Sequence, residues 1–284
     1  MVGPVVVFGA SGQIGMAVSA ALRAAGRPVR PLDRAEADIE DRDAVARAVG
    51  GSAAVVNAAA FTDVEAAETQ GSRAHAVNAV GAAIVAAACA EARVPLLHYS
   101  TDYVFDGASD RAWREDDATR PLSQYGRSKE AGERAVAAAW SRHMVLRTSW
   151  VFSAGNRNFV TTMRRLANER RSISVVDDQT GGPTPADAIA DASLIMIDAA
   201  MRRDFDAWGT YHFSGAPAVS WCGFARSILA DRPETEIVPI RTADFSAKVS
   251  RPANSVLDCS RIASAFGITQ PDWREALSRL FAGR

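Results

Sequence analysis

A tyrosine and a lysine four positions apart, Tyr125 and Lys129, form the pair in this sequence best suited to acid–base chemistry. On a helix, four residues rise about 6 Å and return to nearly the same face, so the phenol and the ammonium group would point into one space. A phenol has a pKa of about 10, and a nearby cation favours its ionised form. Such a pair can give a proton to the alkoxide that forms when a ketone accepts hydride. A YxxxK match also occurs by chance, and an exposed helix pair is the alternative interpretation.

A hydroxyl group that could serve the same reaction lies earlier in the chain. Ser100-Thr101-Asp102 ends the predicted strand Leu96–Ser100, and ligands of doubly wound sheets bind at the carboxyl ends of the strands. Thr101 could orient the ketone oxygen beside Tyr125. We therefore predict Thr101, Tyr125 and Lys129 as the catalytic residues.

A glycine-rich turn follows the first predicted strand, Pro4–Phe8, and precedes a predicted helix. Glycines let the backbone approach a pyrophosphate, and a helix N-terminus offers free N–H groups and a favourable dipole. The spacing is GxxGxxG, the form associated with short-chain dehydrogenases, although a structural turn can look alike. The residues predicted to bind the dinucleotide here are Gly9, Ser11, Gly12, Gln13, Ile14 and Gly15.

The residues after the next two predicted strands bear on the choice of cofactor. Asp33 ends the second strand and could accept hydrogen bonds from the ribose hydroxyls of NAD(H), whereas Arg34 could pair with the 2′-phosphate of NADP(H). The sequence leaves this choice open, and the predicted cofactor is NADPH or NADH. Asp38 and Ile39 are expected to flank the adenine. Small residues follow the third strand, where either the cofactor or close helix packing requires them: Ala58, Ala59 and Ala60.

Short β-branched runs alternate with helical patterns over the first 150 residues. The predicted strands are Pro4–Phe8, Val29–Leu32, Ala54–Asn57, Leu96–Ser100 and Met144–Thr148. The predicted helices are Gln13–Ala25, Asp41–Val49, Ser72–Ala92 and Ser128–Ala139. Near-continuous apolar strands separated by helices indicate an α/β fold with a doubly wound parallel sheet, the Rossmann arrangement.

The regular alternation of strands and helices ends after residue 150, which predicts a smaller α/β lobe. Its predicted elements are a strand at Ser174–Asp177 and helices at Phe159–Asn168, Asp187–Ala200, Trp221–Leu229 and Trp273–Phe281. We expect residues 1–150 to form the dinucleotide-binding Rossmann domain. Residues 151–284 would form mainly a substrate-binding lobe, with some segments returning to the Rossmann sheet. Substrate would bind in the cleft between the two.

Composition argues against several other classes of protein. The formal net charge of −1 gives no electrostatic reason to expect nucleic acid or an anionic membrane as a partner. The arginines at positions 164, 165, 170 and 171 are expected to form a solvated helix face. Neither a targeting signal nor a membrane span is expected, because the apolar stretch Gly81–Ala90 is too short. The three cysteines are widely spaced, and free thiols in a reducing cytoplasm are the simplest interpretation.

Eight motifs, in order along nearly the whole chain, resemble the dTDP-4-dehydrorhamnose reductase family of the extended short-chain dehydrogenase/reductase superfamily. They are FGASGQIG (8–15), NAAAFTDVEAAE (57–68), HYSTDYVFDG (98–107), YGRSK (125–129), LRTSWVF (146–152), DQTGGPT (178–184), YHFSG (211–215) and RPANSVLD (251–258). The STDYVFDG and RPxNSxLD runs are far more specific than the glycine or YxxxK motifs.

The resemblance implies reduction of a nucleotide-linked sugar ketone, dTDP-4-dehydrorhamnose, to dTDP-L-rhamnose by NADPH or NADH. It also implies substrate contacts at Thr62, Val64, Asp102, Tyr103, Trp150 and Arg251. For Arg251, an arginine fork suits a diphosphate, with a surface ion pair as the alternative; for Trp150 the alternative is core packing. Some family members join subunits through a metal bound by an acidic residue two positions after the last glycine. Here that position is Ala17, so we expect no metal site, and a monomer or weak homodimer.

Three other functions remain open from the sequence. Nucleotide-sugar dehydratases and epimerases share the fold and YxxxK, but the dehydratases carry a second acid where this chain has Tyr103. The regulatory subunit of methionine adenosyltransferase also resembles these reductases, and the intact catalytic set argues against that role. A reductase of another nucleotide-linked 4-keto-deoxysugar would share every motif.

Overall fold

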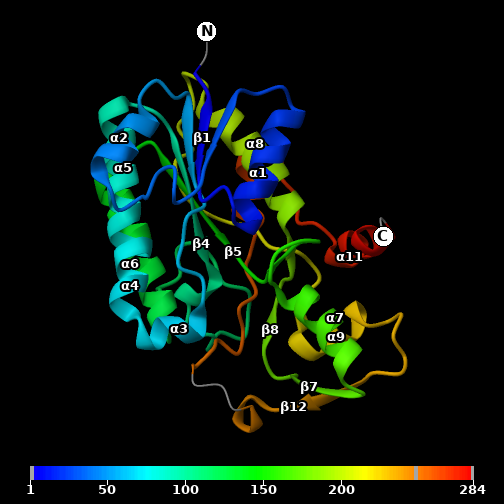
Figure 1. Ribbon diagram of the computed structural model, residues 1–284. Coiled ribbons are helices and arrows are strands. Elements are labelled where there is room, and N and C mark those ends of the chain that lie inside the picture. Colours follow the sequence, from blue (N-terminus) through cyan, green and yellow to red (C-terminus); the bar gives the residue numbers. More distant parts are fainter. Residues whose placement is uncertain (1–2, 246–248, 283–284) are drawn as a thin grey trace.

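The centre of the computed structural model, which describes residues 3–245 and 249–282, is a six-stranded sheet (Figure 1). All five strand pairings are parallel, in the order β2-β1-β3-β4-β5-β10. The strands are β1 (Val5–Phe8), β2 (Val29–Leu32), β3 (Ala54–Asn57), β4 (Leu96–Thr101), β5 (His143–Thr148) and β10 (Gly209–His212). The predicted doubly wound parallel sheet is confirmed.

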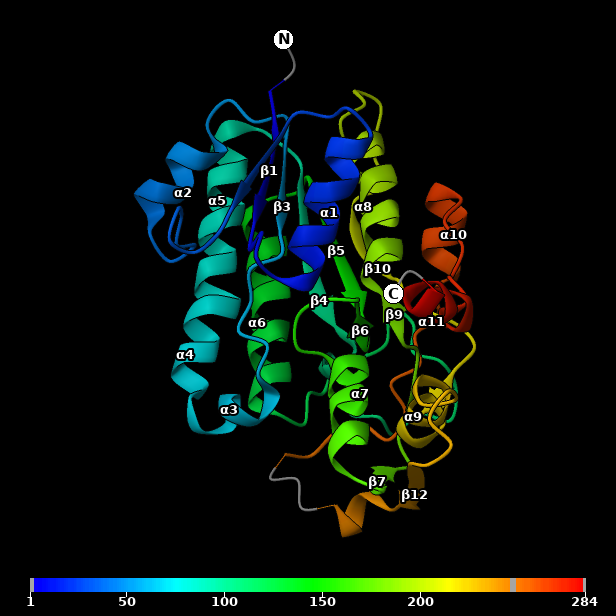
Figure 2. The same cartoon turned by 45° about the vertical axis from the view of Figure 1, so that its right-hand side comes forward.

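Helices cover both faces of the sheet, as Figure 2 shows. On one face lie α2 (Arg42–Val49), α5 (Ala82–Ala92) and α6 (Gln124–Ala139), and on the other α1 (Gln13–Ala24) and α8 (Ala186–Ala200). The strands serve both faces because successive side chains alternate. In β1, Val5 and Val7 join the core with α1 and α8, whereas Val6 and Phe8 join the core with α2 and α5.

One long helical segment runs from Gly71 to Ala92, close to the predicted helix Ser72–Ala92. It consists of α4 (Gly71–His75), a π-helical stretch (Ala76–Gly81) and α5, and α3 (Val64–Thr69) precedes it. The π-helical stretch contains Asn78, whose buried amide bonds to the backbone of Phe61 and to the Ser128 hydroxyl. By length and composition alone this segment could cross a membrane, against the expectation from Gly81–Ala90, but 56% of its apolar window is buried inside the protein.

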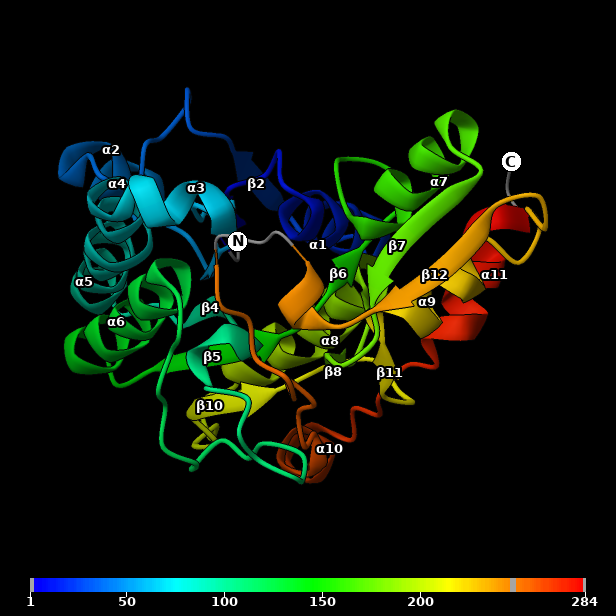
Figure 3. The same cartoon turned by 90° about the horizontal axis from the view of Figure 1, so that it is seen from below.

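A smaller lobe lies beside the sheet domain when the molecule is viewed from below (Figure 3). Its strand pairs are β6 (Val151–Phe152) with β9 (Thr184–Pro185), β7 (Ser172–Val176) with β12 (Glu236–Ile240), and β8 (Thr180–Gly181) with β11 (Val219–Ser220). Its helices include α7 (Phe159–Glu169), α9 (Trp221–Ile228) and α11 (Trp273–Ala282). A separate core of apolar and aromatic side chains, among them Phe152, Phe224 and Trp273, holds this lobe together.

Three elements of the second half belong to the central sheet domain, among them α10 (Ser260–Phe266), which packs on β10 and α8 and buries Ile262 in the sheet-domain core. Strand β10 pairs in parallel with β5, and α8 packs along α1. The sequence did not predict β10, β12 or α10. Strand β10 begins at Gly209, whose φ is +122°, and its four residues are too few and too mixed to show a period of two.

Candidate active site

The glycine turn after β1 forms a cradle in which backbone atoms approach closely. Gly9 has a φ of +74°, in the region that favours glycine. A Cβ at Gly15 would lie 2.2 Å from the carbonyl oxygen of Gly9, so only glycine lets α1 begin so near the turn. Gly12 caps α1 with no side-chain hydrogen bond, and the first turn has no acidic residue. Free N–H groups therefore remain available to a phosphate.

A hollow of about 510 Å³ adjoins this cradle. It contains most of the residues predicted for the adenosine half of the cofactor: Gly9, Ser11, Gly12, Arg34, Asp38, Ile39, Ala58, Ala59 and Ala60. Arg34 forms an ion pair with Asp38 at 3.1 Å. The predicted ribose ligand Asp33 uses its carboxylate locally, because Oδ1 accepts hydrogen bonds from the backbone N–H groups of Ala35 and Glu36.

Sequence reasoning missed a second ion pair in the same hollow. Arg73 of α4 donates to Glu40 at 2.6 Å, and both line the hollow. Glu40 lies two residues after Asp38, but Arg73 is 33 positions farther on, and no motif connects them. The hollow thus holds two arginines, each beside a carboxylate.

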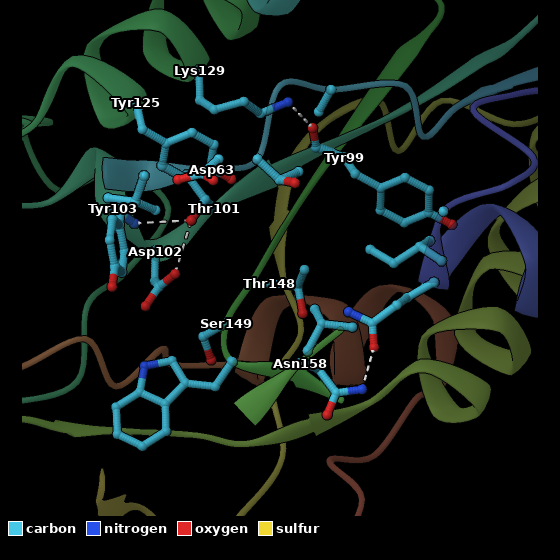
Figure 4. Close-up of a pocket in the computed structure, with 18 of the residues that line it drawn as sticks. Asp63, Tyr99, Thr101, Asp102, Tyr103, Tyr125, Lys129, Thr148, Ser149 and Asn158 are labelled. Atoms are coloured by element: carbon cyan, nitrogen blue, oxygen red, sulfur yellow. Dashed lines mark hydrogen bonds between the residues drawn. The ribbon is translucent and has the colours of Figure 1, made fainter. Parts of the chain in front are cut away.

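A larger cavity of about 760 Å³ lies between the sheet domain and the smaller lobe. It contains every residue predicted to be catalytic or to bind substrate: Thr62, Val64, Thr101, Asp102, Tyr103, Tyr125, Lys129, Trp150 and Arg251. Gln13 and Ile14 of the glycine turn also line it. Figure 4 shows Tyr125, Thr101, Asp102 and Tyr103 gathered on one side. This cavity adjoins the smaller hollow, because both are lined by Gly12 and by the alanines at positions 58–60.

Tyr125 and Lys129 lie on the first turns of α6. The helix begins at Gln124, four residues before the predicted start, because Ser123 caps it by accepting from the N–H of Gly126 at 3.1 Å. Lys129 is 3% exposed, and its Nζ donates to the carbonyl oxygen of Tyr99 at 2.6 Å. Burial lowers the pKa of Lys129 to about 8.

The phenol of Tyr125 holds its proton strongly. Burial raises the pKa of Tyr125 to about 12, and the nearby Thr101 side chain partly offsets that rise. Desolvation dominates this shift, and the expectation that Lys129 favours the phenolate stays a prediction. The ring of Tyr103 packs edge-on against that of Tyr125, with centroids 5.9 Å apart. A protonated, buried phenol beside a hydroxyl is suited to donate a proton.

Thr101 and Asp102 are joined at the carboxyl end of β4. The Thr101 hydroxyl accepts from the N–H of Tyr103 at 3.2 Å and donates to Oδ1 of Asp102 at 2.9 Å. Asp102 is 2% exposed, and its Oδ2 has no hydrogen-bond partner within residues 3–245 and 249–282. Burial raises the pKa of Asp102 to about 7. The carboxyl group is thus poised between its two protonation states near neutral pH.

Trp150 both packs in the lobe and faces the cavity, so its two interpretations are compatible. Its backbone has a φ of +47°, and its indole stacks on Trp221 at 3.4 Å between ring centroids. A Cβ at Gly181 would lie 2.5 Å from the indole of Trp150, which explains the glycine there. Both tryptophans line the cavity and offer it an aromatic wall.

Arg251 lies on the segment that carries the RPxNSxLD run. Asn254 holds that segment by donating to the carbonyls of Ser109 and Arg111. Arg251 donates to Glu65 of α3 at 2.9 Å, and its Nε is buried without a partner in the described part of the chain. The surface ion pair considered from the sequence is present, and it places the guanidinium at the cavity wall.

A loop from the smaller lobe reaches the glycine turn, which the sequence did not predict. Gln13 Oε1 accepts from Ser153 at 2.7 Å and from Asn158 at 2.9 Å, and Asn158 is also drawn in Figure 4. Asn158 caps α7 in a capping box with Thr161. The Asn158-x-x-Thr161 pattern could have shown the helix start, but no local signal reveals the contact with Gln13. Arg157 of the same loop lines the cavity.

The remaining candidates from the sequence have structural partners. Arg164 pairs with Asp231 at 2.6 Å and Arg165 with Glu169 at 2.8 Å. Ala17 packs at the edge of the core between α1 and α8. Across the described residues, no group of three or more His, Cys, Asp or Glu side chains could hold a metal ion.

Comparisons with known proteins agree with this geometry. Residues 3–283 match the family described as RmlD substrate binding domain. The chain is 42% identical to a dTDP-4-dehydrorhamnose reductase of Burkholderia thailandensis, over 96% of each chain. A crystal structure of dTDP-4-dehydrorhamnose reductase from Bacillus anthracis, in complex with NADP, aligns with a TM-score of 0.91 and 32% identity over the whole of both chains. An ortholog from Clostridium acetobutylicum aligns with a TM-score of 0.93 and 32% identity over 98% of each chain.

Proposed function

The chain belongs to the RmlD substrate binding domain family of dTDP-4-dehydrorhamnose reductases, and from that premise we propose how its residues act. It is an NAD(P)H-dependent oxidoreductase that reduces dTDP-4-dehydrorhamnose to dTDP-L-rhamnose. The observation that carries the assignment of roles is the meeting of Thr101, Tyr125 and Lys129 in one cavity beside the glycine cradle.

The residues present fit a nicotinamide dinucleotide. Gly9 and Gly15 let the turn fold tightly against neighbouring backbone, which a Cβ at either position would meet within 2.5 Å, and the start of α1 presents its N–H groups to a pyrophosphate. Arg34 and Arg73 would meet the adenosine ribose or its 2′-phosphate, while Asp38 and Ile39 border the adenine. When bound, the nicotinamide supplies the hydride.

The chain's own residues then handle the proton and the orientation of the sugar. Lys129 is held by Tyr99 near the expected nicotinamide ribose, and its charge favours an anion that develops on the ketone oxygen. Thr101 would turn its hydroxyl proton from Asp102 to that oxygen, and Tyr125 would give the oxygen a proton. The low-dielectric cavity favours proton transfer to the ketone oxygen, because a negative charge left on that oxygen would be costly in a buried site.

The sugar and its diphosphate would occupy the side of the cavity formed by both lobes. Thr62, Val64, Asp102, Tyr103 and Trp150 would contact the sugar or nucleotide, and Arg251 would exchange Glu65 for the diphosphate. Residues 1–150 would form the dinucleotide-binding domain and also supply five of these six substrate contacts, while residues 151–284 would complete the substrate site. The exceptions are β10, α8 and α10, which support the sheet.

We also propose a cytoplasmic protein, monomeric or weakly dimeric, without nucleic-acid or membrane partners. Three buried free thiols, Cys89, Cys222 and Cys259, fit a reducing compartment. Arg165, whose side chain is 60% exposed, supports a solvated helix face, whereas Arg164 packs over the ring of Phe281. The contacts of α5 with α2 and α6 support a core helix at Gly71–Ala92.

The test is oxidation of NADPH and, separately, NADH in the presence of dTDP-4-dehydrorhamnose. Wild-type enzyme should consume cofactor and form dTDP-L-rhamnose. Tyr125→Phe should lower turnover by about 10²–10⁴-fold with cofactor affinity within a few-fold. Tyr211→Phe is the matched control, since Tyr211 bonds to the carbonyl of Ala207 and does not border the cavity. Turnover by Tyr125→Phe within a factor of two of wild type would remove the phenol from the mechanism.

A further inference from the structure

We propose that Arg157, in the loop between β6 and α7, binds the pyrophosphate of the nicotinamide dinucleotide together with the N-terminus of α1. This inference rests on the proposed reductase function and deepens it, because it assigns a cofactor ligand to the smaller lobe. Every cofactor ligand predicted from the sequence lies in residues 1–150. The loop extends from the smaller lobe toward the start of α1 (Figure 3).

Both sequence neighbours of Arg157 attach this loop to the glycine turn. Before it, Nδ2 of Asn156 donates to the carbonyl oxygen of Ser11 at 3.4 Å. After it, Nδ2 of Asn158 donates to Oε1 of Gln13 at 2.9 Å. Arg157 therefore lies between two contacts with the turn whose glycines and free N–H groups fit a pyrophosphate. Its side chain is exposed and lines the cavity beside Gln13.

Further contacts hold the loop in this position without a ligand. The Ser153 hydroxyl donates to Oε1 of Gln13 at 2.7 Å, and Nδ2 of Asn156 lies 3.7 Å from Sδ of Met16 on α1. Asn156 has a φ of +60°, a conformation that asparagine adopts more readily than most residues. A dinucleotide would thus meet a loop that is already placed, so little further ordering opposes binding.

Arg157 also differs in charge from the other arginines that line the two hollows. Arg34, Arg73 and Arg251 each pair with a carboxylate, whereas Arg157 forms no ion pair with any residue that the structure describes. The first turn of α1 carries no acidic residue, and the dipole of a helix supplies only about half a unit charge at its N-terminus. A pyrophosphate needs more positive charge than that, and an arginine fork supplies it in a charge-assisted contact.

The substrate carries a diphosphate too, but the geometry favours Arg251 for that group. Arg251 is held against Glu65 of α3, whereas the neighbours of Arg157 bond to the turn before α1. The two arginines would therefore serve different diphosphates, Arg251 that of the sugar nucleotide and Arg157 that of the cofactor.

Binding titrations of the whole chain with three nucleotides test this assignment. Arg157→Gln should weaken binding of NADPH and of 2′-phospho-ADP-ribose, which share the pyrophosphate, by the same factor of about tenfold, the loss of one charge-assisted contact. Adenosine 2′-monophosphate, which lacks the pyrophosphate, should bind the variant and wild type equally. The control Arg165→Gln removes an exposed arginine of the same lobe, one that pairs with Glu169, and should match wild type with all three.

A second variant tests whether the glycine turn positions Arg157. Ser153→Ala removes the hydroxyl that bonds to Gln13, and Ser153 does not itself border the cavity. This change should weaken NADPH binding by about threefold, the loss of one hydrogen bond. In the Arg157→Gln background it should have little further effect, because the loop then has no phosphate contact to position. Additive losses would mean that Ser153 acts independently of Arg157 and would overturn the positioning.

Three results would overturn the assignment itself. Weaker binding of dTDP by Arg157→Gln, with NADPH binding unchanged, would give the arginine to the diphosphate of the substrate. Unchanged affinity for every nucleotide would leave Arg157 a solvated loop residue. An equal loss with adenosine 2′-monophosphate would place it at the adenosine half. Wild-type enzyme that binds no NADPH would instead reject the reductase function.

Discussion

Replacing the buried carboxyl of Asp102 by an amide should change how stability depends on pH. Asp102→Asn keeps the size of the side chain and an oxygen that accepts from Thr101, but it removes the charge. In the wild-type protein burial raises the pKa of Asp102 from 3.8 to about 7. The folded state therefore binds more protons than the unfolded chain between these values. The stability that the neutral acid contributes is present below about pH 4 and is lost as pH rises to about 7.

The size of the effect follows from linkage. Each unit of pKa difference corresponds to about 1.4 kcal/mol between the two protonation states. For a shift from 3.8 to about 7, the free energy of unfolding that wild type loses between about pH 5.5 and about pH 8 is about 2 kcal/mol. Asp102→Asn does not titrate, so relative to wild type it should gain about that amount over the same range, mostly below pH 7.

Urea unfolding of both proteins at several pH values measures this difference. Other titrating groups affect both proteins alike and cancel in the comparison, and Asp110→Asn serves as the exposed control. A difference between wild type and Asp102→Asn that stays constant across this pH range would refute the reasoning. It would show that Asp102 is ionised in the folded protein throughout.

Three further outcomes are expected. Gly15→Ala should weaken NADPH binding by tenfold or more in a fluorescence titration, because the new Cβ would lie 2.2 Å from the Gly9 carbonyl oxygen. The control Gly50→Ala should bind NADPH normally, since its Cβ would lie 3.4 Å from the nearest atom. Arg34→Ala should lower the ratio of kcat/KM for NADPH to that for NADH by about tenfold, the loss of one charge-assisted contact; an unchanged ratio would show that Arg34 does not reach the 2′-phosphate. Turnover and sedimentation should be the same with Mg²⁺ and with excess EDTA, because Ala17 supplies no carboxylate; a chelator that stops catalysis and splits an assembly would contradict this.

Local sequence patterns predict the sheet domain because its strands and helices carry regular patterns of apolar residues. The apolar runs of β1 and β3 are buried on both faces, as their lack of alternation indicated. The glycine turn required backbone conformations that few other residues adopt. The start of α6 was placed late, since Gln124–Arg127 carries little apolar pattern and only Ser123 marks the cap.

The parts that could not be predicted depend on contacts between distant residues. Strand β10 is recognisable only by its place beside β5, and the pair of Arg73 with Glu40 joins separate helices and loops. Asp33 stands where a ribose ligand was expected, yet its carboxylate turns to the N–H groups of Ala35 and Glu36. That choice depends on the geometry of the following turn, which residue type alone does not specify.

The charges of the site divide between its interior and its rim. In the interior, burial pushes Asp102, Tyr125 and Lys129 each toward its neutral form. Around the rim, arginines remain charged and paired with carboxylates, at Arg34–Asp38, Arg73–Glu40 and Arg251–Glu65. A phosphate that arrives at the rim can replace a carboxylate partner without leaving a bare charge, which lowers the cost of binding. The direction in which a proton moves in the interior is set by the relative pKa values of the groups in contact.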